Sequence, residues 1–140
     1  MDKYAGLCKA AIDMRSRSYA PYSNFRVGAA VLTSDGQIFT GCNIENSAFG
    51  PSICAERCAV SKAVSEGYKL FDAIAIAGAP SGGSLKYCPP CGVCRQVLAE
   101  FAGGDLTVIL ARSETDYKVY KLQDLLPLSF GPDDIAGIKT

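Results

Sequence analysis

Three cysteines and one glutamate have the residue types and the spacing that chemistry at a metal ion requires. Glu56 follows Cys54 by two positions, and Cys91 and Cys94 form a Cys-x-x-Cys pair that begins 37 positions after Cys54. Thiolates are ligands that zinc binds well. Three protein ligands leave the fourth tetrahedral position open for water, whereas structural zinc sites usually fill all four positions with Cys or His. The pattern predicts a catalytic zinc site, and the chain has no histidine to share in it.

Glu56 is the predicted acid and base of this site. Because it lies two positions after Cys54, it is expected to leave the start of a helix on a different side and to face the open position of the metal. A carboxyl group there can take a proton from water and deliver it to a substrate nitrogen. The plain alternative is a glutamate in the first turn of a helix, where the helix dipole favours negative charge. Beside three thiols, we prefer the catalytic interpretation.

Arg57 and Cys88 also bear on this site. Three thiolates around a divalent ion leave an excess negative charge, so a cation is expected close by, and Arg57 is the nearest candidate. The alternative for Arg57 is an exposed position on the helix. Cys88 competes as a ligand because it also forms a Cys-x-x-Cys pair with Cys91, but the following Pro89 favours extended backbone. Cys88 is therefore expected to be a bystander, whereas a purely structural zinc module would use it as a fourth ligand.

The elements that position these residues follow from hydrophobic periodicity and turn residues. Helices are expected over about 2–18, 54–66 and 91–101, strands over 25–33, 37–41, 70–79, 106–111 and 117–120, and a last helical turn over 122–126. Strands that alternate with helices indicate an α/β layered sheet with parallel crossovers. Helices that begin near Cys54 and Cys91 would place the candidate thiolates at helix N-termini, where the dipole lowers thiol pKa values.

Length and composition set further limits. At 140 residues and 49% hydrophobic, residues 1–140 are expected to form a single domain. Fourteen basic and fourteen acidic residues give no net charge, which disfavours a nucleic-acid or membrane-surface partner. The N-terminal residues do not resemble a signal peptide, and the longest apolar run is too short to cross a bilayer, so a soluble, cytoplasmic protein is expected.

The cysteine count points in the same direction. Seven cysteines is an odd number, and without a secretory signal a metal cluster with additional free thiols is a better interpretation than a disulfide framework. Cys8, Cys42 and Cys58 receive no role from the sequence.

Several motifs together resemble a known family. Cys-Ala-Glu-Arg at 54–57 and Pro-Cys-x-x-Cys at 90–94 resemble the signature of the zinc nucleobase deaminases. With three cysteine ligands, and with the segments at 19–23 and 41–46 before them, the chain is most similar to the small homotetrameric cytidine deaminases of pyrimidine salvage. The similarity extends to the Leu-Leu-Pro-x-x-Phe-Gly-Pro run at 125–132, and so covers most of the chain.

This resemblance implies a fold and an activity. The fold would be a three-layer α/β/α sandwich with a mixed five-stranded sheet. The activity would be that of a zinc hydrolase, with one Zn²⁺ per subunit, that converts cytidine and deoxycytidine to uridine and deoxyuridine and releases ammonia. Enzyme alternatives are a relative that acts on a nucleotide, on cytosine in DNA or RNA, or on a nucleoside-like antibiotic. The neutral charge balance argues against a polynucleotide, and Glu45 would repel a phosphate on the sugar.

The resemblance also implies substrate contacts. Asn43 and Glu45 would hold the ribose hydroxyls, Phe25 would stack near the base, and Ala55 would contact the substrate. Phe130 is similar to an aromatic residue that the family places in the pocket of the neighbouring subunit, which would make the homotetramer part of the site. The alternative for both aromatic residues is ordinary packing in a core or an interface.

Overall fold

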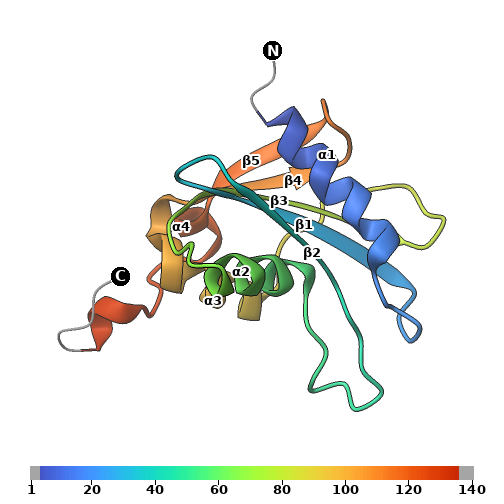
Figure 1. The fold of residues 1–140 in the computed structure, drawn as a ribbon, viewed down its shortest axis with the longest axis horizontal. Helices are drawn as coiled ribbons and strands as arrows, with labels where there is room; N and C mark the ends of the chain where they lie inside the picture. The colour runs from blue at the N-terminus through green and yellow to red at the C-terminus, as the bar shows by residue number, and fades with distance from the viewer. Residues whose placement is uncertain (1–3, 136–140) are drawn as a thin grey trace.

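The computed structural model describes residues 4–135. A single five-stranded sheet, in the order β2-β1-β3-β4-β5, runs through its centre (Figure 1). The strands are β1 (Phe25–Thr33), β2 (Ile38–Cys42), β3 (Phe71–Pro80), β4 (Thr107–Ala111) and β5 (Tyr117–Lys121). The helices are α1 (Ala5–Met14), α2 (Ala55–Ser65), α3 (Gly92–Ala102) and α4 (Leu122–Leu125), with short 3₁₀ turns η1 (Arg15–Arg17), η2 (Gly103–Asp105) and η3 (Pro132–Asp134).

The predicted elements occur in the predicted order. The first helix is shorter than the expected 2–18, because α1 ends at Met14 and continues as the 3₁₀ turn η1; residues 2 and 3 lie outside the described residues. The β1–β2 hairpin turns at Gly36, whose φ of 93° is a backbone conformation that glycine adopts readily. None of the helices in the described part of the chain has the length and hydrophobicity needed to cross a bilayer.

The sheet is mixed, as predicted. β1 pairs antiparallel with both β2 and β3, β3 pairs parallel with β4, and β4 pairs antiparallel with β5. Two helical crossovers therefore join parallel strands. α2 leads from β2 to β3, which run parallel with β1 between them, and α3 leads from β3 to its neighbour β4. The helix of each crossover has a candidate thiol at its N-terminus, Cys54 for α2 and Cys91 for α3.

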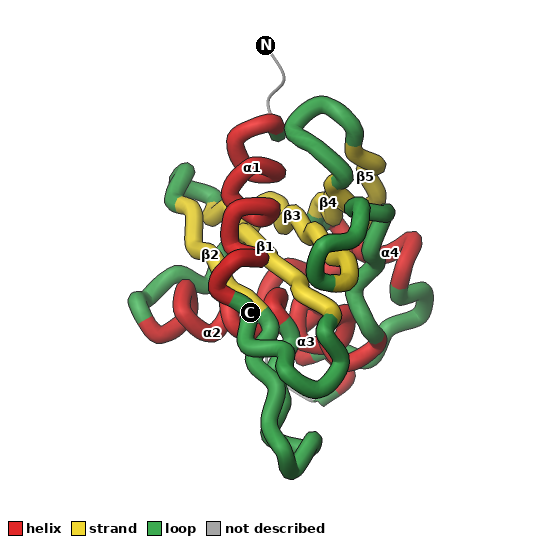
Figure 2. Tube along the Cα trace, turned by 90° about the vertical axis from the view of Figure 1, so that its right-hand side faces the viewer, coloured by secondary structure: helices red, strands yellow, loops and turns green. Residues whose placement is uncertain are grey.

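The sheet is covered on both faces, which makes three layers. Alternate residues of β3 face opposite sides, as strand geometry requires. Ala73, Ala75 and Ala77 pack in one apolar cluster with α1, whereas Ile74 and Ile76 pack in a second cluster with α2 and α3. Figures 1 and 2 show α1 on one side of the sheet and α2 with α3 on the other. The small side chains of β3 let α1 lie close to the sheet.

Gly41 allows α2 to sit directly on β2. A Cβ atom at Gly41 would lie 2.4 Å from the Ala59 amide nitrogen and 2.5 Å from the Ala55 carbonyl oxygen, which is closer than real Cβ contacts. No residue with a side chain fits there unless the helix moves. The glycine therefore sets the depth at which the first turn of α2, with Glu56, packs on the sheet.

Candidate metal centre and active site

The three predicted thiol ligands come together at the starts of two helices. Cys54 is the N-cap residue of α2 and Cys91 is the N-cap residue of α3, while Cys94 lies in the first turn of α3. The Cys54 and Cys91 sulfurs are 3.8 Å apart, and the Cys91 and Cys94 sulfurs are 3.5 Å apart. All three lie within 4.8 Å of one another, and no other such cluster of potential ligands occurs in residues 4–135.

This geometry fits zinc. Sulfurs bound at about 2.3 Å to a tetrahedral ion lie about 3.8 Å from one another, which is close to the two observed separations. Cys88 is not part of the cluster, so the fourth ligand that a structural zinc module would need is not supplied by this residue. All seven cysteines are free thiols. The cluster is therefore positioned for metal binding with three protein ligands.

The surroundings of Cys54 favour the anionic, thiolate form of its side chain. Hydrogen bonding to Cys94 and then to Arg57 lowers the pKa of the Cys54 thiol to about 5. The same interaction with Cys54, together with burial, raises the pKa of Cys94. Arg57 Nη2 lies 3.6 Å from the Cys54 sulfur, as the predicted neighbouring cation should. Close thiolates repel one another, and a divalent cation between them would offset that repulsion.

Glu56 is buried beside the cluster. Its side chain is 4% exposed and its Oε1 atom has no hydrogen-bond partner. Burial raises the pKa of this carboxyl group to about 7, a value that suits a group that both accepts and donates protons near neutral pH. Glu56 also lines a cavity of about 500 Å³, together with Cys54 and Cys91. An unpartnered carboxyl oxygen in such a place is costly and calls for a ligand.

Asn43 and Glu45 lie in the same cavity wall, and both are already hydrogen-bonded. Asn43 Oδ1 accepts from the Val27 amide at 2.9 Å, and Asn43 Nδ2 donates to the Phe25 carbonyl at 2.8 Å. The Glu45 carboxylate accepts from the Ser23 side chain and from main-chain amides of the 19–24 segment. Each side chain retains hydrogen-bonding capacity for a ligand, because an amide and a carboxylate offer more sites than these bonds use.

Comparison with known proteins agrees with this geometry. A family profile described as "Cytidine and deoxycytidylate deaminase zinc-binding region" matches residues 1–110. The chain belongs to this family. Cytidine deaminase from Sporosarcina psychrophila is 45% identical over 122 residues, which cover 87% of this chain and 87% of that protein. Probable cytidine deaminase from Dictyostelium discoideum is 45% identical over 128 residues, which cover 91% and 84% of the two chains.

A solved structure is similar as well. The crystal structure of cytidine deaminase from Burkholderia pseudomallei, 43% identical in sequence, superposes with a TM-score of 0.82 and covers 93% of this chain and 100% of its own. The predicted deaminase family, the α/β fold and the zinc cofactor are confirmed.

The sequence did not reveal one wall of this deaminase-family cavity. Cys88 and Pro89 line it, and burial raises the pKa of the Cys88 thiol to about 11. A Cβ atom at Gly78 would lie 2.8 Å from the Cys88 sulfur and 3.1 Å from the Phe25 ring, so Gly78 makes room for both side chains. Phe25 thus lies beside Cys88, next to the residues that line the cavity. The pairing of β1 with β3 brings Phe25 to Gly78, and an isolated bridge between Gly78 and Lys86 brings the segment with Cys88 to the same place.

The remaining predicted residues differ in position. Ala55, the first residue of α2, is buried and lines the cavity. Phe130 is 60% exposed and lies outside this lining. Phe49, which the sequence did not single out, does line the cavity, and its ring packs edge-on against Tyr22 with centroids 6.1 Å apart. Its φ of 61° is unusual for a phenylalanine and is visible only in the folded backbone.

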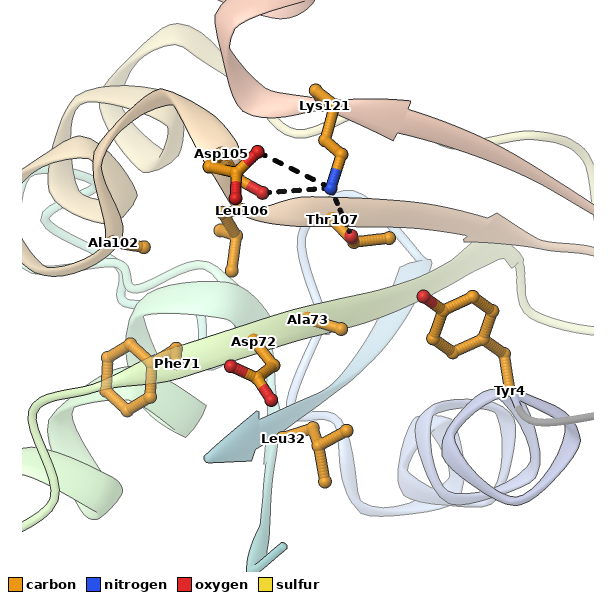
Figure 3. Close-up of a pocket in the computed structure, with 10 residues that line it drawn as sticks. All are labelled: Tyr4, Leu32, Phe71, Asp72, Ala73, Ala102, Asp105, Leu106, Thr107 and Lys121. Atoms are coloured by element: carbon orange, nitrogen blue, oxygen red, sulfur yellow. Dashed lines mark hydrogen bonds and ion pairs between the residues drawn. The ribbon is translucent and has the colours of Figure 1, made fainter. Parts of the chain in front are cut away.

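A second cavity, of about 370 Å³, lies where β3 and β4 begin, and Tyr4, Asp72 and Lys121 are among the residues that line it (Figure 3). Its cation is already paired: Lys121 Nζ donates to the Asp105 carbonyl and to Thr107 Oγ1, both at 3.2 Å. This cavity brings together none of the cysteines and does not include Glu56. Of these two cavities, only the first is lined by Cys54, Glu56 and Cys91.

Proposed function

We propose that this chain hydrolyses cytidine and deoxycytidine to uridine and deoxyuridine and releases ammonia, as a cytoplasmic enzyme of pyrimidine salvage. The observation that carries the proposal is the buried, unpartnered Oε1 of Glu56 in a cavity beside three clustered cysteine sulfurs. The abundance of free thiols agrees with a reducing compartment.

The reaction replaces the amino group of the base by the oxygen of water. When bound by Cys54, Cys91 and Cys94, zinc supplies a Lewis acid that lowers the pKa of water. Glu56 holds and moves the protons: its carboxylate accepts one, and its protonated form donates to the ring nitrogen next to the reacting carbon. A second transfer through Glu56 protonates the departing amine, so the carbon–nitrogen bond breaks with ammonia as the leaving group. The raised pKa of Glu56 lets one group serve in both directions.

The cavity wall orients the nucleoside in this proposal. Glu45 accepts hydrogen bonds from ribose hydroxyls and Asn43 contributes its remaining amide capacity. Ala55 offers a main-chain N–H at the start of α2, where such groups have no partner within the helix. Phe25 stacks near the base at the edge of the cavity. Free nucleosides, rather than a polynucleotide, suit a chain without net charge.

Assembly completes the proposed site. We infer a homotetramer in which Phe130 of one subunit enters the cavity of its neighbour. Phe130 and Leu128 are exposed apolar side chains on the C-terminal segment, and Phe130 is outside the cavity lining of its own chain. Two large exposed apolar side chains close together on one segment would supply apolar surface for a subunit interface to bury.

A Glu56→Gln variant tests the function. We expect it to retain one zinc per chain and to bind cytidine, while its rate of ammonia release falls by about 10²-fold to 10⁴-fold, because only proton transfer is lost. Glu66→Gln, at the exposed C-terminal end of the same helix, is the matched control and should keep full activity. Loss of the cytidine absorbance band, in proportion to ammonia released, is the measurement. Unchanged turnover in Glu56→Gln would remove Glu56 from the mechanism.

A further inference from the structure

Arg95 joins two parts of the chain that are far apart in sequence. It follows the ligand Cys94 in the first turn of α3, and its side chain is partly buried. Nε donates to the Pro90 carbonyl at 2.8 Å, and Nη1 donates to the Leu125 carbonyl at 2.6 Å. Both bonds are short and use different nitrogens of one planar group. A guanidinium holds its donors in a fixed arrangement, so the positions of the two carbonyls are linked.

The first of these carbonyls leads directly into the metal cluster. Pro90 is fully buried, and its carbonyl belongs to the peptide unit that ends at Cys91. A bond to this carbonyl fixes the orientation of the peptide plane and hence the direction from which the Cys91 sulfur reaches the cluster. Groups that orient ligands in this way affect metal affinity.

The second carbonyl belongs to the C-terminal segment. Leu125 is the last residue of α4, where a carbonyl has no partner within the helix. The next residue of α3, Gln96, extends the attachment, because its Nε2 donates to the Phe130 carbonyl at 2.7 Å. Residues 125–130 are therefore fastened at both ends to the helix that carries Cys94.

Both hydrogen bonds of the Arg95 guanidinium go to main-chain carbonyls. Within residues 4–135, Arg95 forms no ion pair with a carboxylate, and both of its partners are main-chain carbonyls. Arg112, in contrast, forms an ion pair with Asp116 at 3.3 Å. Because Arg95 is partly buried and donates to one carbonyl in each segment, its role is to link the Pro90–Cys91 turn to the C-terminal segment. It does not balance the charge of a carboxylate.

We propose that Arg95 is a positioning residue that couples the metal-binding turn at Pro90–Cys91 to the C-terminal segment 125–130. Zinc binding at the cysteines then orders the segment that carries Phe130, and the segment in turn holds Cys91 in its binding position. The consequence for catalysis rests on the proposed function, in which Phe130 serves a neighbouring subunit. The coupling itself concerns only metal binding and chain order.

Hydrogen exchange with and without zinc tests the coupling. In the parent protein, zinc should slow exchange of the amides in 122–131 by about fivefold or more. The Leu126 amide, which donates to the Leu122 carbonyl at 2.9 Å, is a suitable probe. In Arg95→Met, which keeps the length of the side chain but has no donors, the zinc-dependent slowing should disappear. Zinc affinity, measured by competition with a chelator, should fall by about 10-fold to 100-fold.

Two further variants separate the coupling from general damage. Arg95→Lys keeps the charge, but an ammonium cannot reach both carbonyls in the geometry of the guanidinium, so it should also lose the slowing. It provides the test if Arg95→Met does not fold. Arg112→Met removes an arginine from a surface ion pair and should leave both readouts unchanged. Gln96→Ala should speed exchange near Phe130 only, without changing zinc affinity.

Failure of the Arg95 coupling can be told apart from failure of the proposed cytidine deamination. None of these measurements uses cytidine, so a chain that fails to release ammonia can still show the coupling, and an active chain can lack it. Zinc-dependent slowing in 122–131 that persists in both Arg95→Met and Arg95→Lys would overturn the proposal. Absence of any such slowing in the parent protein would also overturn it.

Discussion

Arg57 Nη2 lies 3.6 Å from the sulfur of Cys54, so the guanidinium at the start of α2 contacts a candidate metal ligand. The same nitrogen lies 3.5 Å from the Ser52 carbonyl, and the buried Nε has no partner. Hydrogen bonding to Cys94, and then this contact with Arg57, lower the pKa of the Cys54 thiol to about 5. A cation at this distance also draws charge from a cluster of three thiolates.

Removal of this cation should weaken zinc binding. In Arg57→Met we expect zinc affinity to fall by about 10-fold to 100-fold, because a charge-assisted hydrogen bond to a ligand is lost. The pKa of Cys54 should rise, so that protons compete with zinc at higher pH than in the parent protein. Competition with a chelator at several pH values measures both effects. Arg57→Lys keeps the positive charge, so its zinc affinity should lie between those of the parent protein and of Arg57→Met. Equal zinc affinities in all three proteins would contradict the role of Arg57.

The clustering of the three thiols at helix N-termini and the strands were predictable because their signals are local. Cys54 directly precedes one helical pattern, and Cys91 and Cys94 open another, so each short stretch of sequence by itself places its thiols at a helix N-terminus. The hairpin around Gly36 is similar, because glycine at a turn allows the positive φ that the turn requires.

Other parts of the site depend on contacts that no local pattern reports. Cys88 became part of the cavity wall because Gly78 leaves room for it, and these positions meet only after 78 and 86 pair. Arg95 reaches the carbonyl of Leu125, 30 positions further along the chain. A main-chain carbonyl has the same chemistry at every residue, so the sequence cannot indicate which one a side chain will find.

The Glu45 carboxylate should stay ionised in unusually acidic solution. The hydrogen bond from the Ser23 side chain lowers its pKa below the ordinary value for glutamate, since an acceptor that is bonded as an anion resists protonation. In Ser23→Ala this pKa should rise toward its ordinary value. Glu45 of the variant therefore becomes protonated at a higher pH than Glu45 of the parent protein. As pH falls, KM for cytidine should begin to rise at a higher pH in the variant.

Carbon-13 NMR of the Glu45 carboxyl group measures this pKa directly, and KM as a function of pH gives the functional consequence. Ser16→Ala is a suitable control, because its hydroxyl donates to the Asp13 carbonyl on an exposed surface and does not contact Glu45. A titration of Glu45 that is the same in Ser23→Ala and in the parent protein would show that this hydrogen bond does not set the pKa.

Zinc removal should destabilise the fold. This effect should depend on the three clustered cysteines and not on Cys88. Cys54 and Cys91 begin different helices, so an ion held between them ties α2 to α3. A ligand that binds only the folded chain stabilises it by about 1.4 kcal/mol for each tenfold increase in free ligand above the dissociation constant. The free energy of urea unfolding should therefore rise with buffered free zinc at about this slope.

Cys94→Ser should reduce this zinc-dependent stabilisation sharply at the same zinc concentrations, because it weakens a ligand in the cluster. Cys88→Ser should retain the full slope and midpoint, since the Cys88 sulfur is outside the cluster; a shift comparable to that of Cys94→Ser would show that Cys88 binds the ion and that the site is closed by four protein ligands.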